Sequence, residues 1–74
     1  MKKLTVEQKT LLSTLKAMAD DNGKLLVNIM EVVSISGLEY EESAFVAREL
    51  TDLGYINVDF PTDTNKILFT VLNK

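Results

Sequence analysis

The residues best suited to chemistry are carboxylates that crowd the middle of the chain. Glu39, Glu41 and Glu42 stand within four positions. This spacing could provide an acid–base pair, a protein-binding surface or negative charge that complements a helix start. The 74 residues include no cysteine and no histidine, which removes the thiolate nucleophile, the usual general base and the commonest zinc ligand. We therefore expect no enzyme, no cofactor and no metal site.

A second polar run begins at Asp20 and superficially resembles the start of a calcium-binding loop. With Asp20 at the third loop position and Gly23 at the sixth, the first and last ligand positions fall on Met18 and Ile29. Both positions require carboxylates. The run is therefore interpreted as a helix end followed by a polar loop.

Charge is distributed unevenly along the sequence, whose net charge is −3. Residues 1–30 contain five lysines and three carboxylates, whereas residues 31–63 contain eight carboxylates and one cation, Arg48. Because duplex DNA is bound mainly through lysine and arginine contacts to phosphate, the acidic middle opposes nucleic-acid binding. The basic cluster available to nucleic acid consists of Lys2, Lys3, Lys9, Lys16 and Lys66. Because no aromatic residues are interleaved with these lysines, they are interpreted as solvated surface charge.

The first half of the chain predicts two helices separated by a short strand. Thr5 and Gln8 have capping-box spacing, so a helix is expected over residues 6–21, ended by Asn22-Gly23. Residues 24–27 suit a strand, and Asn28 has the spacing of an N-cap for a helix reaching residue 36. The β-branched residues of this last segment would suit a strand equally well.

The second half predicts a third helix and a β-hairpin. Apolar and small residues recur at helical spacing over residues 40–53, which places one set on the inner face: Ser43, Val46, Ala47, Leu50 and Leu53. Residues 55–60 alternate, with Ile56, Val58 and Phe60 on the inner side. A polar turn over residues 61–66 leads to a returning strand over residues 67–72.

The run Val46-Ala47-Arg48-Glu49-Leu50-Thr51-Asp52-Leu53-Gly54-Tyr55-Ile56 resembles the junction of recognition helix and wing in the winged helix-turn-helix family. The resemblance covers about residues 5–72 and implies a small α+β winged helix of three helices, a short strand and a C-terminal hairpin. It also implies a third helix that enters the DNA major groove. The three glutamates at the start of that helix depart from this expectation.

The outer face of the expected third helix carries an aromatic residue, Phe45, close to Tyr40 and to carboxylates. An aromatic anchor inside a polar rim is typical of protein-binding surfaces. Phe45 could instead pack against the wing, the first helix or a dimer mate. The expected protein-binding set is Tyr40, Glu41, Phe45, Glu49 and Asp52.

The returning strand has apolar residues on both faces, and the face bearing Leu68 and Leu72 needs cover from the first helix or from a second chain. Two functions follow for one domain spanning residues 1–74. In the first, a regulatory module binds a basic protein surface through its acidic third helix. In the second, a dimeric regulator binds DNA through Arg48, Lys66, Lys9 and Lys16. No apolar run approaches the length of a membrane span, so a soluble cytoplasmic protein is expected.

Overall fold

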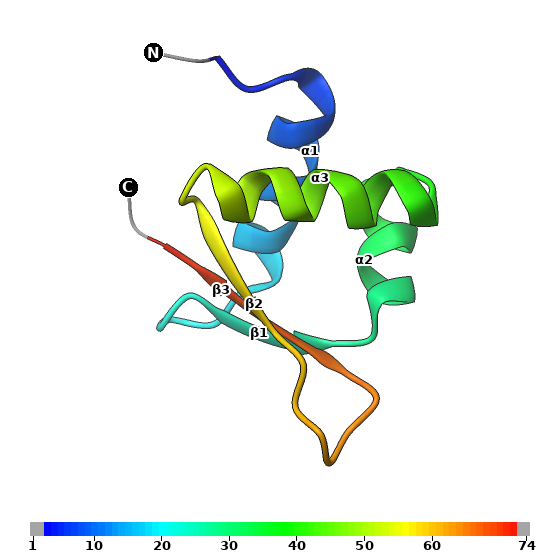
Figure 1. The fold of residues 1–74 in the computed structure, drawn as a ribbon, viewed down its shortest axis with the longest axis vertical. Helices are drawn as coiled ribbons and strands as arrows, with labels where there is room; N and C mark the ends of the chain where they lie inside the picture. Colours follow the sequence, from blue (N-terminus) through cyan, green and yellow to red (C-terminus); the bar gives the residue numbers. More distant parts are fainter. Residues whose placement is uncertain (1–2, 73–74) are drawn as a thin grey trace.

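The computed structural model describes residues 3–72 and has the α+β fold of a small winged helix (Figure 1). Three helices and a three-stranded antiparallel sheet alternate along the chain. In order they are α1 (Val6–Met18), β1 (Lys24–Val27), α2 (Ile29–Ser36), α3 (Tyr40–Asp52), β2 (Ile56–Asp59) and β3 (Ile67–Val71). The fold class and element order expected from the sequence are confirmed.

Local capping explains where the first two helices begin. The Gln8 backbone N–H donates to Thr5 Oγ1 at 3.1 Å, and the Thr5 N–H donates to Gln8 Oε1 at 2.9 Å, which completes the capping box. The Asn28 carboxamide oxygen accepts from the Met30 N–H at 3.0 Å. Residues 29–36 are therefore helical despite their β-branched side chains, because the cap satisfies a free N–H and Val32 is buried.

The first helix ends earlier than expected, at Met18 rather than near residue 21. Ala19 is extended (ψ 153°), and Asp20 Oδ1 accepts from the N–H groups of Asn22 and Lys24, both at 2.9 Å. Gly23 therefore does not end the helix but closes the turn into β1. Its φ is +77°, and a Cβ there would lie 2.8 Å from the Val71 carbonyl oxygen, so only glycine fits.

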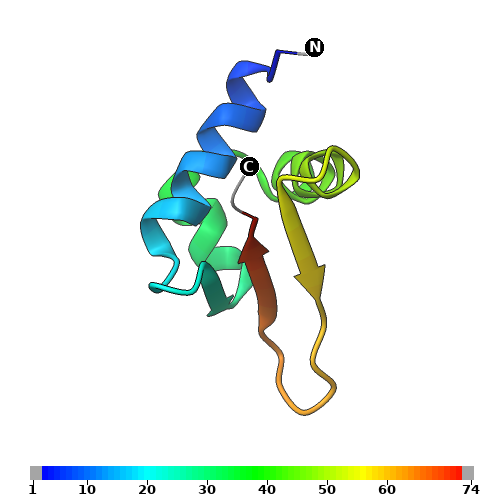
Figure 2. The ribbon, with the colours of Figure 1, turned by 90° about the vertical axis from the view of Figure 1, so that its left-hand side faces the viewer.

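The sheet order is β1-β3-β2, which makes the C-terminal strand central (Figure 2). Phe69 pairs with Leu25 on one side and Val58 on the other, and all three point to the core side. On the opposite face Leu68 lies between Leu26 and Asp59. The backbone of β3 is thus hydrogen-bonded on both edges, and only its outward side chains need cover.

One apolar core joins the helices to the sheet. Its most buried side chains are Leu11, Leu15, Val32, Leu50, Ile56 and Phe69. The expected inner face of α3 is confirmed for Ser43, Val46, Ala47 and Leu50, which are all buried. Ser43 is fully buried, and its Oγ has no hydrogen-bond partner among the described residues.

The sequence-based placement of two residues, Leu53 and Phe60, on the inner face is wrong. Leu53 is 42% exposed because α3 ends at Asp52 and the chain turns away there. Phe60 is 72% exposed because β2 ends at Asp59, so the strand alternation no longer orients the next side chain. The hairpin strands are correspondingly shorter than the ranges 55–60 and 67–72.

Two substitutions in α3 test which of its faces supports the fold. Leu50→Ala should lower the free energy of unfolding by about 2–5 kcal/mol, because Leu50 is fully buried and its loss leaves a cavity. Phe45→Ala should cost less than about 1 kcal/mol because its ring is 63% exposed. Thermal and denaturant melts of both variants beside the parent measure this difference. Equal destabilisation would mean that Phe45 is a core residue.

Candidate functional site

Helix α3 has one side that no other element covers. In Figure 2, α3 is seen nearly end-on, with α1 and α2 on one side of the molecule and α3 with the hairpin on the other. Phe45 is 63% exposed and Tyr40 is 53% exposed. Glu41, Arg48 and Asp52 are also exposed. The sequence-based interpretation of an outward-facing Phe45 is therefore confirmed.

The N-terminal end of α3 is acidic, but its first glutamate does not cap it. Glu39 occupies the N-cap position without a side-chain hydrogen bond, and Glu41 and Glu42 follow in the first turn. All three side chains are exposed to solvent. The carboxylates are available to a partner, and their proximity to the helix start is electrostatically favourable.

The residues expected to bind a protein do not all share one surface. Glu49 is half-buried and accepts a hydrogen bond from Gln8 Nε2 at 3.2 Å, so it is turned toward α1. Tyr40 and Asp52 line a groove on a different side of α3, which faces the sheet. Glu41 and Phe45 lie on the solvent side. The structure thus leaves Tyr40, Glu41, Phe45 and Asp52 all exposed, but on two sides of α3, and sets Glu49 apart against α1.

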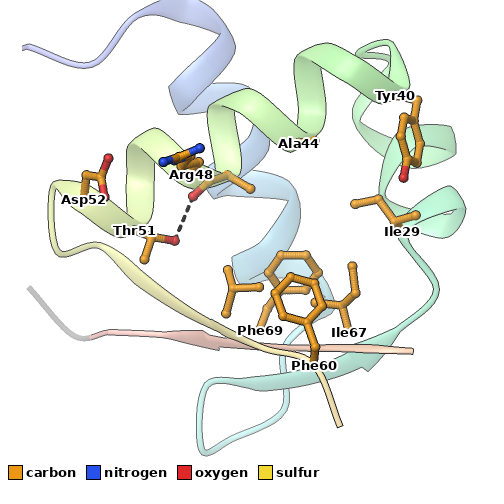
Figure 3. Close-up of a pocket in the computed structure, with 11 residues that line it drawn as sticks. Ile29, Tyr40, Ala44, Arg48, Thr51, Asp52, Phe60, Ile67 and Phe69 are labelled. Atoms are coloured by element: carbon orange, nitrogen blue, oxygen red, sulfur yellow. Dashed lines mark hydrogen bonds between the residues drawn. The ribbon is translucent and has the colours of Figure 1, made fainter. Parts of the chain in front are cut away.

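The groove between α3 and the sheet is a feature that the sequence analysis missed. Its volume is about 460 Å³ (Figure 3), and its lining is mostly apolar. The lining residues are Ile29, Tyr40, Ala44, Ala47, Arg48, Thr51, Asp52, Val58, Phe60, Ile67 and Phe69. A signal was present, since Ala44 and Ala47 put two small side chains on the α3 face toward the sheet.

Figure 3 shows how the groove is built. Phe60, Phe69 and Ile67 lie below the middle of α3, with Tyr40 and Ile29 toward one end of the helix and Thr51 and Asp52 toward the other. The Thr51 hydroxyl donates to the Ala47 carbonyl oxygen at 2.8 Å. Exposed Phe60 forms part of the rim, and Phe69, at 1% exposure, belongs to the core below it.

The basic residues expected to contact nucleic acid fall into two separate groups. Arg48 lies on the exposed part of α3, and Lys66 lies in the hairpin loop, so both belong to the same half of the molecule. Lys9 and Lys16 are exposed on α1, whose opposite face packs into the core. Lys2 lies outside the described residues. A straight duplex lying on α3 would not also reach the outer face of α1.

Carboxylates dominate the half of the molecule that contains α3 and the hairpin. Between residues 39 and 66 the exposed cations are Arg48 and Lys66. The exposed carboxylates in the same range are Glu39, Glu41, Glu42, Asp52, Asp59 and Asp63. The local field therefore repels phosphate and attracts cations at low salt.

The leucines expected at a dimer interface are half-buried within the monomer. Leu68 lies on the outer sheet face beside Leu26, which is 49% exposed. Leu72 follows β3, where its N–H donates to the Tyr55 carbonyl oxygen at 2.9 Å. Leu26 and Leu68 together form a small apolar patch between Lys24, Asn57 and Asp59.

Within residues 3–72, no helix combines the length and apolar character that crossing a membrane requires. In the same residues, no group of three or more acidic, histidine or cysteine side chains is arranged to hold a metal ion.

Comparisons with known proteins give a structural likeness. The sequence matches no protein-family model and no curated protein. The structure is similar to that of BpsR from Bordetella bronchiseptica, a protein whose DNA binding is regulated by 6-hydroxynicotinic acid. The TM-score is 0.71 and the sequence identity is 22%, and the match covers 96% of this chain but 46% of BpsR. The chain therefore shares the fold of somewhat less than half of a DNA-binding regulator.

Proposed function

We propose that this chain is the winged-helix module of a DNA-binding transcription regulator. The observation that carries the proposal is the uncovered position of α3 beside a protruding hairpin (Figures 1 and 2). A helix and a wing presented on one side can dock on a duplex together. The likeness to BpsR, whose DNA binding is regulated, supports this function. Such a regulator acts without catalysis and works in the cytoplasm.

In the proposed complex, α3 lies in the major groove and the hairpin loop lies along the phosphate backbone. Arg48 and Lys66 supply the phosphate contacts because they are the exposed cations of this half. The six exposed carboxylates oppose docking, so one copy alone binds weakly. At about 0.15 M salt we expect no measurable duplex binding by the monomer. Salt screens distant charges at this concentration, so the nearby carboxylates determine the electrostatic interaction with the duplex.

Weak binding by each copy makes a dimer necessary in this proposal. The patch formed by Leu26 and Leu68, together with Leu72, is the surface proposed to pair two copies. When two modules are linked in a dimer, binding of the first module raises the effective concentration of the second at the duplex, so the overall affinity increases. The outer sheet face is suited to this because it leaves α3 and the hairpin loop of each copy free.

A second candidate function is binding to a basic protein surface. It is favoured by Phe45, whose ring is 63% exposed on α3 among carboxylates. Aromatic residues within a polar rim supply much of the binding energy in protein interfaces. The region defined by Tyr40, Glu41, Phe45 and Asp52 is the proposed contact.

Charge-removing variants test the phosphate contacts. Binding of a fluorescent random-sequence duplex is measured by anisotropy from about 0.05 M salt upward. Arg48→Gln and Lys66→Gln should each weaken binding and reduce the salt slope by about one. Lys9→Gln makes the same charge change on the outer face of α1 and should leave the slope unchanged. An equal loss of duplex affinity in all three variants would show that binding depends only on net charge.

The variant Glu41→Lys separates the two candidate functions by the sign of its effect. Duplex affinity should rise about tenfold, because a repulsive charge on α3 becomes attractive. Binding of basic peptides, selected from a displayed library on the parent protein, should weaken instead. Glu7→Lys on α1 is the matched control. A drop in peptide binding for Glu41→Lys and Phe45→Ala, with no duplex binding by any variant, would favour the protein-binding function.

The variant Leu68→Glu tests the dimer. It should convert a dimer to a monomer without unfolding it, because Leu68 is half-buried and the new carboxylate would have to be desolvated in the interface. Asn57→Glu places the same charge on an exposed position of the neighbouring strand and should have a smaller effect. Sedimentation equilibrium measures the oligomeric state of each variant, and circular dichroism measures whether the variant is folded. A parent protein that stays monomeric at high concentration would contradict the proposed dimer.

A further inference from the structure

The groove between α3 and the sheet is an elongated apolar surface that follows the helix. Tyr40 lies toward one end of α3 and Asp52 toward the other (Figure 3), and both line the groove. They are twelve positions apart, which corresponds to about 18 Å along an α-helix. An extended peptide segment of about six residues, at about 3.3 Å per residue, has a matching length.

Apolar side chains that a partner can reach lie on both walls of the groove. Phe60 is 72% exposed and Tyr40 is 53% exposed, so both rings present surface to a bound molecule. Ala44 is exposed on the helix wall, and Val58 and Ile67 are half-buried on the sheet wall. Because apolar surface gains free energy when it leaves water, these side chains favour an occupant that is itself apolar along most of its length.

Exposed carboxylates stand at both ends of the groove. Asp52 lines one end, and Glu41 follows Tyr40 at the other. Glu41 is three positions before Ala44, a spacing that makes the two residues neighbours on the surface of α3. The cation of the lining is Arg48, which stands between the two carboxylates along the helix. Carboxylates therefore outnumber cations at the groove, and its ends favour a positively charged partner.

We infer that the groove binds a short cationic segment of another protein, in which apolar side chains lie between two lysine or arginine residues. The apolar side chains lie against Tyr40 and Phe60, and the two cations lie near Glu41 and Asp52. Burial of apolar surface supplies affinity, and the charges at both ends fix the position of the segment. This inference rests on the second candidate function, binding to a basic protein surface, and assigns the apolar contacts of the partner to the groove rather than to Phe45.

Three blocked hexapeptides test the inference by ¹H–¹⁵N NMR titration of the full chain. The first, the lysine peptide, has lysine at both ends and leucine and phenylalanine between them. One control has glutamate in place of both lysines, and the other has serine in place of the apolar residues. The lysine peptide should bind about tenfold more tightly than either control, because it alone matches both the apolar walls and the acidic ends. Amide shifts should centre on Tyr40, Ala44, Phe60 and Ile67. Equal affinity for the three peptides, or shifts that centre on α1, would overturn the inference.

Substitutions on the two sides of α3 locate the site. Ala44→Leu fills the groove and Phe60→Ser removes an exposed ring from its wall, so each should weaken binding of the lysine peptide about tenfold. Ala17→Leu, a matched change at an exposed position of α1, should leave the affinity unchanged. Dispersed spectra establish that each variant is folded. Binding that is lost in Phe45→Ala but unaltered in Ala44→Leu and Phe60→Ser would overturn the groove as the site and leave the second candidate function standing.

Arg48→Gln separates peptide binding from duplex binding by the sign of its effect. The variant removes the cation of the groove lining and should strengthen binding of the lysine peptide about threefold. The same variant weakens the duplex in the proposed DNA complex. Lys9→Gln removes an equal charge from the outer face of α1 and should change peptide affinity less. Weaker binding of the lysine peptide to Arg48→Gln would overturn the inference. If library-selected basic peptides bind the parent and the lysine peptide does not, the inference fails while the second candidate function stands.

Discussion

The burial of one narrow stripe of α3 is the constraint on which the rest of this structure depends. Leu50 is fully buried, and its carbonyl oxygen accepts from the Tyr55 N–H at 3.0 Å as the chain turns into β2. The same stripe includes Ser43, which is fully buried and whose hydroxyl has no hydrogen-bond partner among the described residues. Because the chain has one small core, this packing determines the rotation of α3, and hence which side chains face solvent, α1 or the sheet.

That rotation places the side chains of α3 outside its buried stripe in three surroundings. Glu49 is hydrogen-bonded to Gln8 of α1, Phe45 is exposed to solvent, and Arg48 lies at the groove. Residues that are neighbours in sequence thus serve different surfaces. Among the described cations, Lys9 and Lys16 are exposed on α1, whereas Arg48 is exposed on α3 and Lys66 in the hairpin loop.

The fold and the charge of this chain favour different ligands. A helix beside a wing is a shape suited to a duplex, whereas the exposed side chains of residues 39–66 are mostly carboxylates. A fold can support several functions, and the site determines which one is performed. Substitutions of α3 side chains therefore distinguish DNA binding from binding to a basic protein surface. The groove beside them has a mostly apolar lining with Arg48 and Asp52 among its residues.

Local sequence signals determined most of the architecture. Thr5 with Gln8, and Asn28 with Gly37, set helix ends through hydrogen bonds and a left-handed glycine, and the apolar spacing of α3 predicted Val46, Ala47 and Leu50 as core. These features depend on residues three or four positions apart, which is why they are visible in the chain itself. Only the tertiary structure decided the central position of β3, the exposure of Leu53 and Phe60, and the groove. The position of β3 and the groove depend on how segments far apart in sequence are arranged, and the exposure of Leu53 and Phe60 depends on where α3 and β2 end, which the periodic spacing within each element does not encode.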